Sequence, residues 1–287
     1  MSHRADAGEE SLSERDFARL RDLIRTQAGI CLGAEKKTMV EVRLKRRLRA
    51  LNMASYHDYC ELLFRRGAKA DEVVSLIDVI TTNKTDFFRE PAHFDFLAER
   101  ALPELSAKNA GAHPLVIWSA GCSSGEEPYT LAMVLSEYAA AHAGFRFRIL
   151  ATDISTAMLQ KAVLGVYPAE AIVPVTQSRR QKFLLRSRDS KSARVRIVPE
   201  LRRAVEFRRL NFMDADYTLS EKADAIFCRN VLIYFDRSTQ QSILSKLVAH
   251  LVPSGYLFVG HSETLHDMDL PVVPVGPALY RKTDACA

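Results

Sequence analysis

The sequence contains few cysteines, and their spacing offers no pattern for a metal site or a disulfide framework. There are five cysteines in 287 residues, and no Cys-x-x-Cys pair occurs among them. We therefore predict no zinc site, no other metal site and no disulfide framework. Scattered thiols are typical of a reducing compartment, so we expect a cytoplasmic protein. The five are Cys31, Cys60, Cys122, Cys228 and Cys286.

Long apolar runs are also missing. No stretch approaches the roughly 18 uninterrupted apolar residues of a membrane span, so we expect no membrane insertion. The first residues, MSHRADAGEESLSERD, lack an apolar core, so we expect no signal peptide. Hydrophobic residues make up 47% of the chain and charged residues 26%, which is ordinary globular composition. The length fits one large domain or two smaller ones.

The first 80 residues have the pattern of a small helical domain. Residues 13–16 resemble a capping box, and Phe17, Leu20, Ile24 and Ala28 follow at helical spacing. A second helix is predicted from about Glu35 to Leu51, and shorter amphipathic segments near 56–66 and 71–80. The net charge of +5 is concentrated in the second helix, whose stretch 36–49 reads KKTMVEVRLKRRLR. Arg43, Arg46 and Arg47 share one face of it, because positions three and four apart are neighbours.

The remainder of the chain alternates strands and helices. After a polar break at 81–86, Pro91 is placed to begin a helix running to about Leu105. From residue 114, short apolar runs alternate with amphipathic helices, which predicts a parallel sheet covered on both faces. The predicted strands are LVIWSA (115–120), FRILATD (147–153), ADAIFCRN (223–230) and GYLFVGH (255–261).

Three finer features follow from the same pattern. The last long helix should bury Ile243, Leu244, Leu247, Val248 and Leu251 and stop at Pro253 to Gly255. Basic, alternating residues from about 165 to 209 predict a partly β insertion standing off the main sheet. The stretch PALYRK near the chain end could be an edge strand.

The turn GCSSGEEP after the first strand lacks the features of a phosphate-binding loop. A P-loop needs G-x-x-x-x-G-K-[ST], but Gly121 and Gly125 are too close together, and Glu126 stands where the lysine would be. Glu126 and Glu127 occupy the start of the next helix and would repel a pyrophosphate. They suit a ligand with a nucleoside end and a positive tail, such as S-adenosylmethionine.

A third acid, on the next strand, agrees with an adenosyl ligand. Asp153 ends the next strand, about where doubly wound folds place an acid on the ribose hydroxyls. The alternative is structural: Glu126 and Glu127 as ordinary first-turn acids, and Asp153 as the N-cap of the following helix.

Further motifs are spread over nearly the whole chain: RLKRRLRAL (43–51), TTNKTDFFRE (81–90), WSAGCSSGEEPY (118–129), ATDIS (151–155), DAIFCRNVLIYFD (224–236) and GYLFVGHSE (255–263). In these stretches the chain resembles the CheR family, the S-adenosylmethionine-dependent methyltransferases of bacterial chemoreceptors. The resemblance implies an all-α N-terminal domain (1–80), a linker that contributes to the cofactor site (81–90) and a methyltransferase domain (91–287). The last would be a Rossmann-like class I methyltransferase α/β sheet with a β-subdomain inserted at about 165–209.

The resemblance also implies the site residues. The cofactor-binding set is Asn83, Thr85, Arg89, Glu127, Asp153, Asn211, Phe212, Arg229 and Asn230. Arg89 and Tyr234 are the candidates for orienting the attacking group. Each has a structural alternative: Asn83 and Thr85 as turn and cap residues, Arg89 as a surface cation, Phe212 as core, Arg229 as the partner of an acid, and Tyr234 as a half-buried aromatic residue.

The implied reaction is methyl esterification of receptor glutamates, with S-adenosylhomocysteine as product. A glutamate carboxylate is already the anion at pH 7, so no base is needed. Arg43, Arg46 and Arg47 would dock the acidic helical region of the receptor, or would simply form a solvated face. Some members also bind a receptor C-terminal peptide at the β-subdomain. The corresponding loop here (186–197) lacks the glycines expected of them, so the sequence leaves this partner open.

Two other functions are compatible with part of the pattern. A nucleic-acid methyltransferase would fit the basic segments, but enzymes that methylate base amines carry [DN]-P-P-[YF] where this chain reads RNVLIY. We therefore expect no nucleic-acid partner. A non-catalytic module that binds the cofactor as a signal would need the same pocket. Nothing in the sequence demands more than a monomer.

Overall fold

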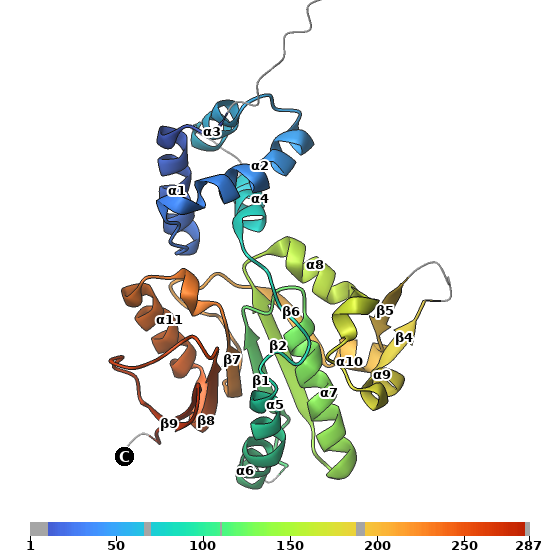
Figure 1. Ribbon diagram of the computed structural model, residues 1–287. Coiled ribbons are helices and arrows are strands. Elements are labelled where there is room, and N and C mark those ends of the chain that lie inside the picture. Colours follow the sequence, from blue (N-terminus) through green and yellow to red (C-terminus); the bar gives the residue numbers. More distant parts are fainter. Residues whose placement is uncertain (1–10, 66–69, 110, 188–192, 285–287) are drawn as a thin grey trace, which may run out of the picture. The chain divides into compact units, whose positions relative to one another are not determined.

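The computed structural model describes residues 11–65, 70–109, 111–187 and 193–284, and the chain divides into two compact units, Met1–Thr82 and Asn83–Ala287 (Figure 1). Each unit has its own hydrophobic core. Within the described residues, none of the helices combines the length and the apolar character needed to cross a membrane.

Within the described residues of the first unit, every regular element is a helix, as the sequence predicts. Ser13 caps the first helix by accepting a hydrogen bond from the Asp16 amide at 3.0 Å, and Leu12 and Phe17 are buried around the cap. The second helix begins two residues later than predicted, because Ala34–Lys36 forms a 3-10 turn. The four helices are α1 (Glu14–Ala28), α2 (Lys37–Leu51), α3 (Tyr56–Phe64) and α4 (Ala70–Ile80).

The second unit is built on a seven-stranded sheet in the order β6-β2-β1-β7-β8-β10-β9. The first five of these strands are parallel, and β10 runs antiparallel to both β8 and β9. All six residues of β7 are buried, as a strand covered on both faces requires. The strands are β1 (Leu115–Ala120), β2 (Phe147–Asp153), β6 (Val205–Arg209), β7 (Ala223–Cys228), β8 (Leu251–Val259), β9 (Val272–Gly276) and β10 (Leu279–Lys282).

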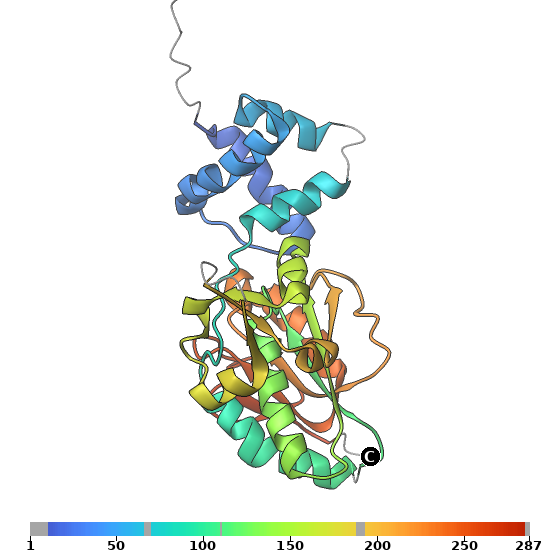
Figure 2. The ribbon, with the colours of Figure 1, turned by 90° about the vertical axis from the view of Figure 1, so that its right-hand side faces the viewer.

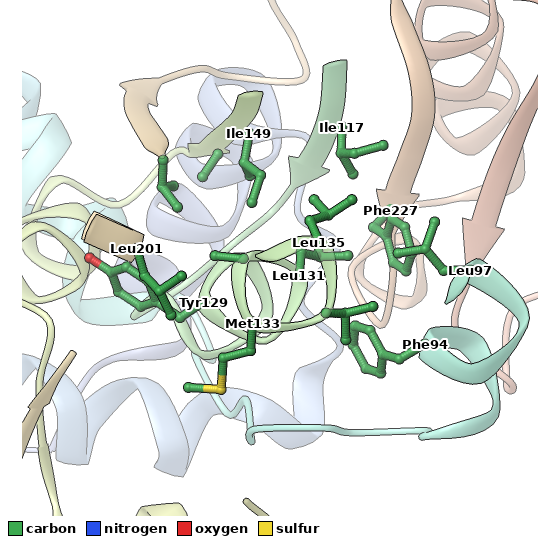
Figure 3. Packing of buried hydrophobic residues seen from close by; sticks show 14 of the residues in the cluster. Phe94, Leu97, Ile117, Tyr129, Leu131, Met133, Leu135, Ile149, Leu201 and Phe227 are labelled. Carbon is green, nitrogen blue, oxygen red and sulfur yellow. The ribbon is translucent and has the colours of Figure 1, made fainter. Parts of the chain in front are cut away.

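Helices cover both faces of this sheet. The predicted helix after Pro91 runs as α5 (Ala92–Phe96), a π turn (Leu97–Ala101) and α6 (Leu102–Asn109), four residues beyond the predicted end. It shares one core with α7 (Glu126–Ala141), whose Leu131 and Leu135 point toward the strands that carry Ile117 and Phe227 (Figure 3). Trp118, the next residue of β1, points to the opposite face and packs edge-on to Tyr217 at 5.9 Å. The other long helices are α8 (Thr156–Leu164) and α11 (Arg237–Ala249).

A small second sheet, in the order β3-β5-β4, confirms the predicted inserted β-structure (Figure 2). The predicted extent, 165–209, is wrong at its end, because β6 (205–209) pairs in parallel with β2 and belongs to the main sheet. Residues 188–192 of the predicted peptide-binding loop lie outside the described residues. The elements of the insertion are β3 (Val166–Pro168), a 3-10 turn (Ala169–Ile172), α9 (Gln177–Phe183), β4 (Leu184–Arg186), β5 (Arg194–Ile197) and α10 (Pro199–Arg203).

Two other predicted details are corrected near the chain end. Leu251 is not part of the last helix but begins β8, where it pairs with Ala223 of β7. The strand within PALYRK, β10, is not an edge strand either, because β9 pairs with its outer side. A buried apolar residue such as Leu251 fits a helix or a strand equally well, and the position of β10 in the sheet depends on strand pairing, which local sequence does not contain.

Candidate active site at the carboxyl edge of the sheet

The turn between β1 and α7 forms the centre of the candidate site. Gly125 has a φ of 98° and precedes Glu126, the first residue of the helix. A Cβ atom there would lie 2.9 Å from the Ala162 side chain and 2.9 Å from the Tyr167 hydroxyl. Glycine is therefore required both for the backbone conformation and for the close approach of α8.

Glu126 and Glu127 occupy the first turn of α7, as predicted, but neither is an ordinary exposed acid. Glu126 is 8% exposed and accepts a hydrogen bond from the Ser124 hydroxyl at 2.7 Å. Glu127 accepts from the Ser119 hydroxyl at 2.7 Å and lies 3.2 Å from Arg229 Nη1. Burial raises the pKa of both carboxyls, and for Glu127 the charge of Arg229 opposes that rise.

Asp153, at the end of β2, holds this turn in place. One of its carboxylate oxygens accepts from the Ser123 amide and the other from the Ser155 amide, each at 2.8 Å. The N-cap of α8 is Ser155, whose hydroxyl accepts from the Met158 amide, so the alternative reading of Asp153 as that cap is wrong. Asp153 instead joins the turn after β1 to the end of β2, and its contact with the ribose of an adenosyl ligand stays a prediction.

Arg229 lies almost fully buried beneath the edge, with 2% of its side chain exposed. It pairs with Glu127 on one side and with Glu90 Oε2 at 2.9 Å on the other, and it also donates to the Arg89 carbonyl. Its guanidinium stands over the Phe94 ring, 5.3 Å from the centroid. The structural alternative for Arg229 is thus observed, while a direct contact with the cofactor stays a prediction.

Sequence reasoning missed Glu90. It ends the stretch TTNKTDFFRE, and it is the residue that binds both Arg229 and the Asn230 side chain, the latter at 3.3 Å. Arg229 lies between Glu90 and Glu127 and offsets part of their negative charge. The carboxyl edge of the sheet is therefore less negative than the sequence suggested. The only available signal was an acid next to Pro91 at the end of a motif.

Glu263 was missed as well. Its carboxylate accepts from three backbone amides: Asn230 at 2.9 Å, Gly260 at 2.6 Å and Leu232 at 2.7 Å. It therefore ties the end of β7 to the end of β8 and fixes Asn230 in a left-handed conformation with φ 57°. A Cβ atom at position 260 would lie 2.8 Å from the Asn230 amide nitrogen, so only glycine fits there.

The segment from Asn83 to Arg89 lies against the glycine turn. The Asn83 carbonyl accepts from the Ser123 hydroxyl at 2.9 Å, and Phe87 is buried edge-on to Tyr167 with ring centroids 4.9 Å apart. Thr85 is half-buried in the same segment. Arg89 is half-buried too, and its Nη1 donates to the Lys84 carbonyl at 3.2 Å.

The loop after β6 brings Asn211 and Phe212 to the same edge. The Leu210 amide donates to the Asp153 carbonyl at 3.0 Å, so the next residue emerges beside the predicted ribose acid. Phe212 is 9% exposed and packs against Phe235 with centroids 6.2 Å apart, so it is partly core, as its alternative held. Tyr234 is half-buried in the short 3-10 helix Leu232–Tyr234 that follows β7.

The three predicted docking arginines do not form a free basic face. Arg47 donates to both carboxylate oxygens of Glu72, through Nε at 2.8 Å and through Nη2. Arg43 donates to the Ile80 carbonyl and to the Thr82 hydroxyl, the latter at 3.1 Å. Arg46 alone of the three is exposed. A docking role for all three remains a prediction, but two of them stabilise their own unit.

Sheet order, glycine turn and strand-end acids together define the class of protein. Strands β6-β2-β1-β7-β8, with β10 antiparallel beside them and a buried acid at the end of β2, form the sheet of a Rossmann-like methyltransferase. The first turn of α7 presents carboxylates where a phosphate-binding loop presents bare amides, which fits S-adenosylmethionine, a donor with a positive sulfonium and no phosphate.

Comparison with known proteins identifies the family. Residues 83–275 match the model of the CheR methyltransferase SAM-binding domain, and residues 15–81 match that of the CheR methyltransferase all-alpha domain. The chain belongs to the CheR methyltransferase family. It binds S-adenosylmethionine through the second unit and is a methyltransferase.

Curated relatives agree over nearly the full length. The chain is 38% identical to a chemotaxis protein methyltransferase of Borreliella burgdorferi over 95% of each chain. It is 39% identical to the chemotaxis protein methyltransferase of Escherichia coli, over 94% of this chain and 91% of that one. Among solved structures, the chain is similar to the crystal structure of magnesium protoporphyrin IX methyltransferase from Synechocystis with bound SAM. The sequence identity is 16% and the TM-score is 0.34, over 70% of this chain and 84% of that one.

Proposed function

We propose that this protein transfers the methyl group of S-adenosylmethionine to glutamate side chains in the cytoplasmic helical region of bacterial chemoreceptors. The products would be glutamate methyl esters and S-adenosylhomocysteine. Family membership supports the methyl transfer, and the relatives, which are named chemotaxis protein methyltransferases, support the receptor as substrate. The observation that carries the proposal is the acidic carboxyl edge formed by Glu127 and Asp153.

The residues at this edge have distinct proposed roles toward the cofactor. Bound S-adenosylmethionine supplies an electrophilic methyl group on its sulfonium. Asp153 would accept from the ribose hydroxyls, with Asn211 and Phe212 beside the adenine. Glu127 would face the positive tail, and Arg229 with Glu90 holds Glu127 in position. Asn83, Thr85 and Asn230 would complete the contacts from the linker and from the end of β7.

Arg89 and Tyr234 would act on the substrate. A receptor glutamate enters as the carboxylate, since its ordinary pKa is near 4.3, so this chain has no proton to remove. Arg89 can hold a carboxylate through parallel hydrogen bonds, and the Tyr234 hydroxyl can donate one more. Their task is orientation, because a tighter grip would draw charge from the attacking oxygen. Positioning and exclusion of water account for the rate.

The identity of the product tests the proposal. The protein is incubated with methyl-labelled S-adenosylmethionine and a chemoreceptor cytoplasmic fragment, and the labelled product is then treated with mild alkali. We expect volatile labelled methanol, because a carboxyl methyl ester hydrolyses under these conditions. Asp153→Ala should abolish the label, whereas Asp267→Ala, an exposed aspartate, should retain it.

Each other outcome would favour a different function. Alkali-stable label on added nucleic acid would point to the nucleic-acid methyltransferase. Cofactor binding without transfer to any acceptor would point to a non-catalytic signalling module. Equal labelling by the Asp153 and Asp267 variants would contradict the assigned site.

A further inference from the structure

A second cluster of polar side chains lies beside the candidate active site and includes Glu90. Glu90 and His93 flank Pro91 at the start of α5, and His261 follows β8. One ligand atom from each of the three lies within 4.8 Å of the others. The rings of His93 and His261 meet edge to face, with centroids 5.0 Å apart. None of the motifs places these residues together, because 168 positions separate His93 from His261 in the chain.

The distances approach those of a tetrahedral metal site. Ligand atoms bound at about 2.1 Å to a tetrahedral ion are about 3.4 Å apart. Glu90 Oε2 lies 3.5 Å from His93 Nδ1, which matches that spacing. It lies 4.0 Å from His261 Nε2, and the three ligand atoms lie within 4.8 Å of one another, so His261 must move inward to complete the site. His261 can do so, because its side chain is 52% exposed.

His93 is the strongest evidence for a ligand at this position. It is 1% exposed, and within the described part of the chain neither of its ring nitrogens has a hydrogen-bond partner. Buried polar groups are rarely left without one. A bound ion would supply the missing partner for one of these nitrogens.

The surroundings also suit a ligand imidazole. The Pro277 carbonyl lies near the His93 ring, although it falls short of hydrogen-bond geometry. A metal-bound imidazole needs such an acceptor for its other N–H. The exposed side of His261 leaves a route for the ion and a place for water as the fourth ligand.

Arg229 is the one unfavourable neighbour. Its Nη2 lies 2.9 Å from the same Glu90 oxygen, and its charge would repel a cation. A carboxylate oxygen has more than one lone pair, so it can serve both groups. Glu127 offsets the arginine from the other side at 3.2 Å. Together with Glu90, it leaves the Arg229 cluster with one net negative charge before any ion binds.

We propose that Glu90, His93 and His261 form a binding site for a zinc-class divalent ion. Two imidazole nitrogens and one carboxylate oxygen are the donors that Zn²⁺ and Co²⁺ prefer, with water in the open position. Mg²⁺ and Ca²⁺ favour all-oxygen ligands and should not bind here.

Cobalt absorption tests the site directly. The untagged full chain is freed of metal and titrated with Co²⁺, whose visible absorption reports tetrahedral coordination. We expect one equivalent to bind, with Zn²⁺ displacing it and Mg²⁺ having no effect. His261→Ala should weaken Co²⁺ binding at least tenfold. His266→Ala should not, because His266 is an exposed histidine beside Asp267, outside the cluster.

The test replaces the exposed ligand, His261, because replacing the buried His93 could unfold the unit. Calorimetric S-adenosylmethionine binding would verify that each variant is folded. No tetrahedral band in the unchanged protein, or equal Co²⁺ affinity in the His261 and His266 variants, would overturn the proposal. The measurement needs no receptor, so a failure of the receptor assay leaves it unaffected.

Discussion

Arg47 and Arg229 illustrate how a charged residue's role depends on its neighbours. Both occur in basic or polar stretches, and both were predicted to contact a ligand. The structure pairs Arg47 with Glu72, which is 9% exposed and also accepts from the Tyr59 hydroxyl at 2.9 Å. It pairs Arg229 with two glutamates. Spacing along a helix identifies a shared face, but it says nothing about which acid from another helix meets that face.

Arg47→Ala should therefore destabilise the helical unit. The substitution leaves the Glu72 carboxylate and Tyr59 hydroxyl without their cation, which should cost about 2 kcal/mol of unfolding free energy. Arg46→Ala, one position away and exposed, should change it by no more than about 0.5 kcal/mol. Urea denaturation followed by circular dichroism measures both. Equal stability of the two variants would contradict a structural role for Arg47 and would leave it available for the predicted docking role.

Most strands and helices could be predicted from the spacing of hydrophobic residues along the chain. The way in which these elements are connected could not be predicted. β1 and β2 have the predicted bounds, because largely apolar segments of six and seven residues are too short for a typical helix and have the length of a strand. The boundary between α11 and β8 was misplaced, and β6 was assigned to the insertion. How β7 and β8 are joined at their ends depends on Glu263, for which the local sequence gave no signal.

Glu263→Gln should weaken cofactor binding. The Glu263 carboxylate accepts hydrogen bonds from three backbone amides, whereas a glutamine would turn an N–H group toward at least one of them. The loss should loosen Asn230 and the short helix that carries Tyr234, with a fall in S-adenosylmethionine affinity of about tenfold. Isothermal titration calorimetry measures this, with Glu200→Gln, an exposed glutamate of α10, as the matched control. An unchanged dissociation constant would show that Glu263 only supports the fold.

For the whole molecule, the chain has two units with separate cores, and the proposed function divides between them. The predicted cofactor residues, from Asn83 onward, lie in the second unit, and the predicted docking arginines lie in the first. The net charge of +5 would attract acidic receptor helices at long range. Since Arg43 and Arg47 are used internally, Arg46 is the member of the set best placed to act on a partner.

Arg46→Glu should raise the KM for the receptor fragment without changing S-adenosylmethionine affinity. Reversal of one exposed charge should cost roughly 1 kcal/mol in docking, or about fivefold in KM at low salt. The effect should shrink as salt is added, because exposed charges are screened. Arg15→Glu, an exposed arginine of α1 with the same change in net charge, is the control. Equal KM values for the two variants would mean that net charge, rather than this helix, attracts the receptor.

The sequence by itself determined the two-part organisation, the parallel sheet, the glycine turn and the acids at the strand ends. Each of these depends on local period, backbone freedom or the chemistry of adjacent residues, which a linear reading contains. Only the tertiary structure decided that Glu90 and Glu127 enclose Arg229, that Glu263 ties two strands together, and that His93 meets His261. Those contacts join residues far apart in the chain, and their energies come from burial and pairing that exist only once the sheet has formed.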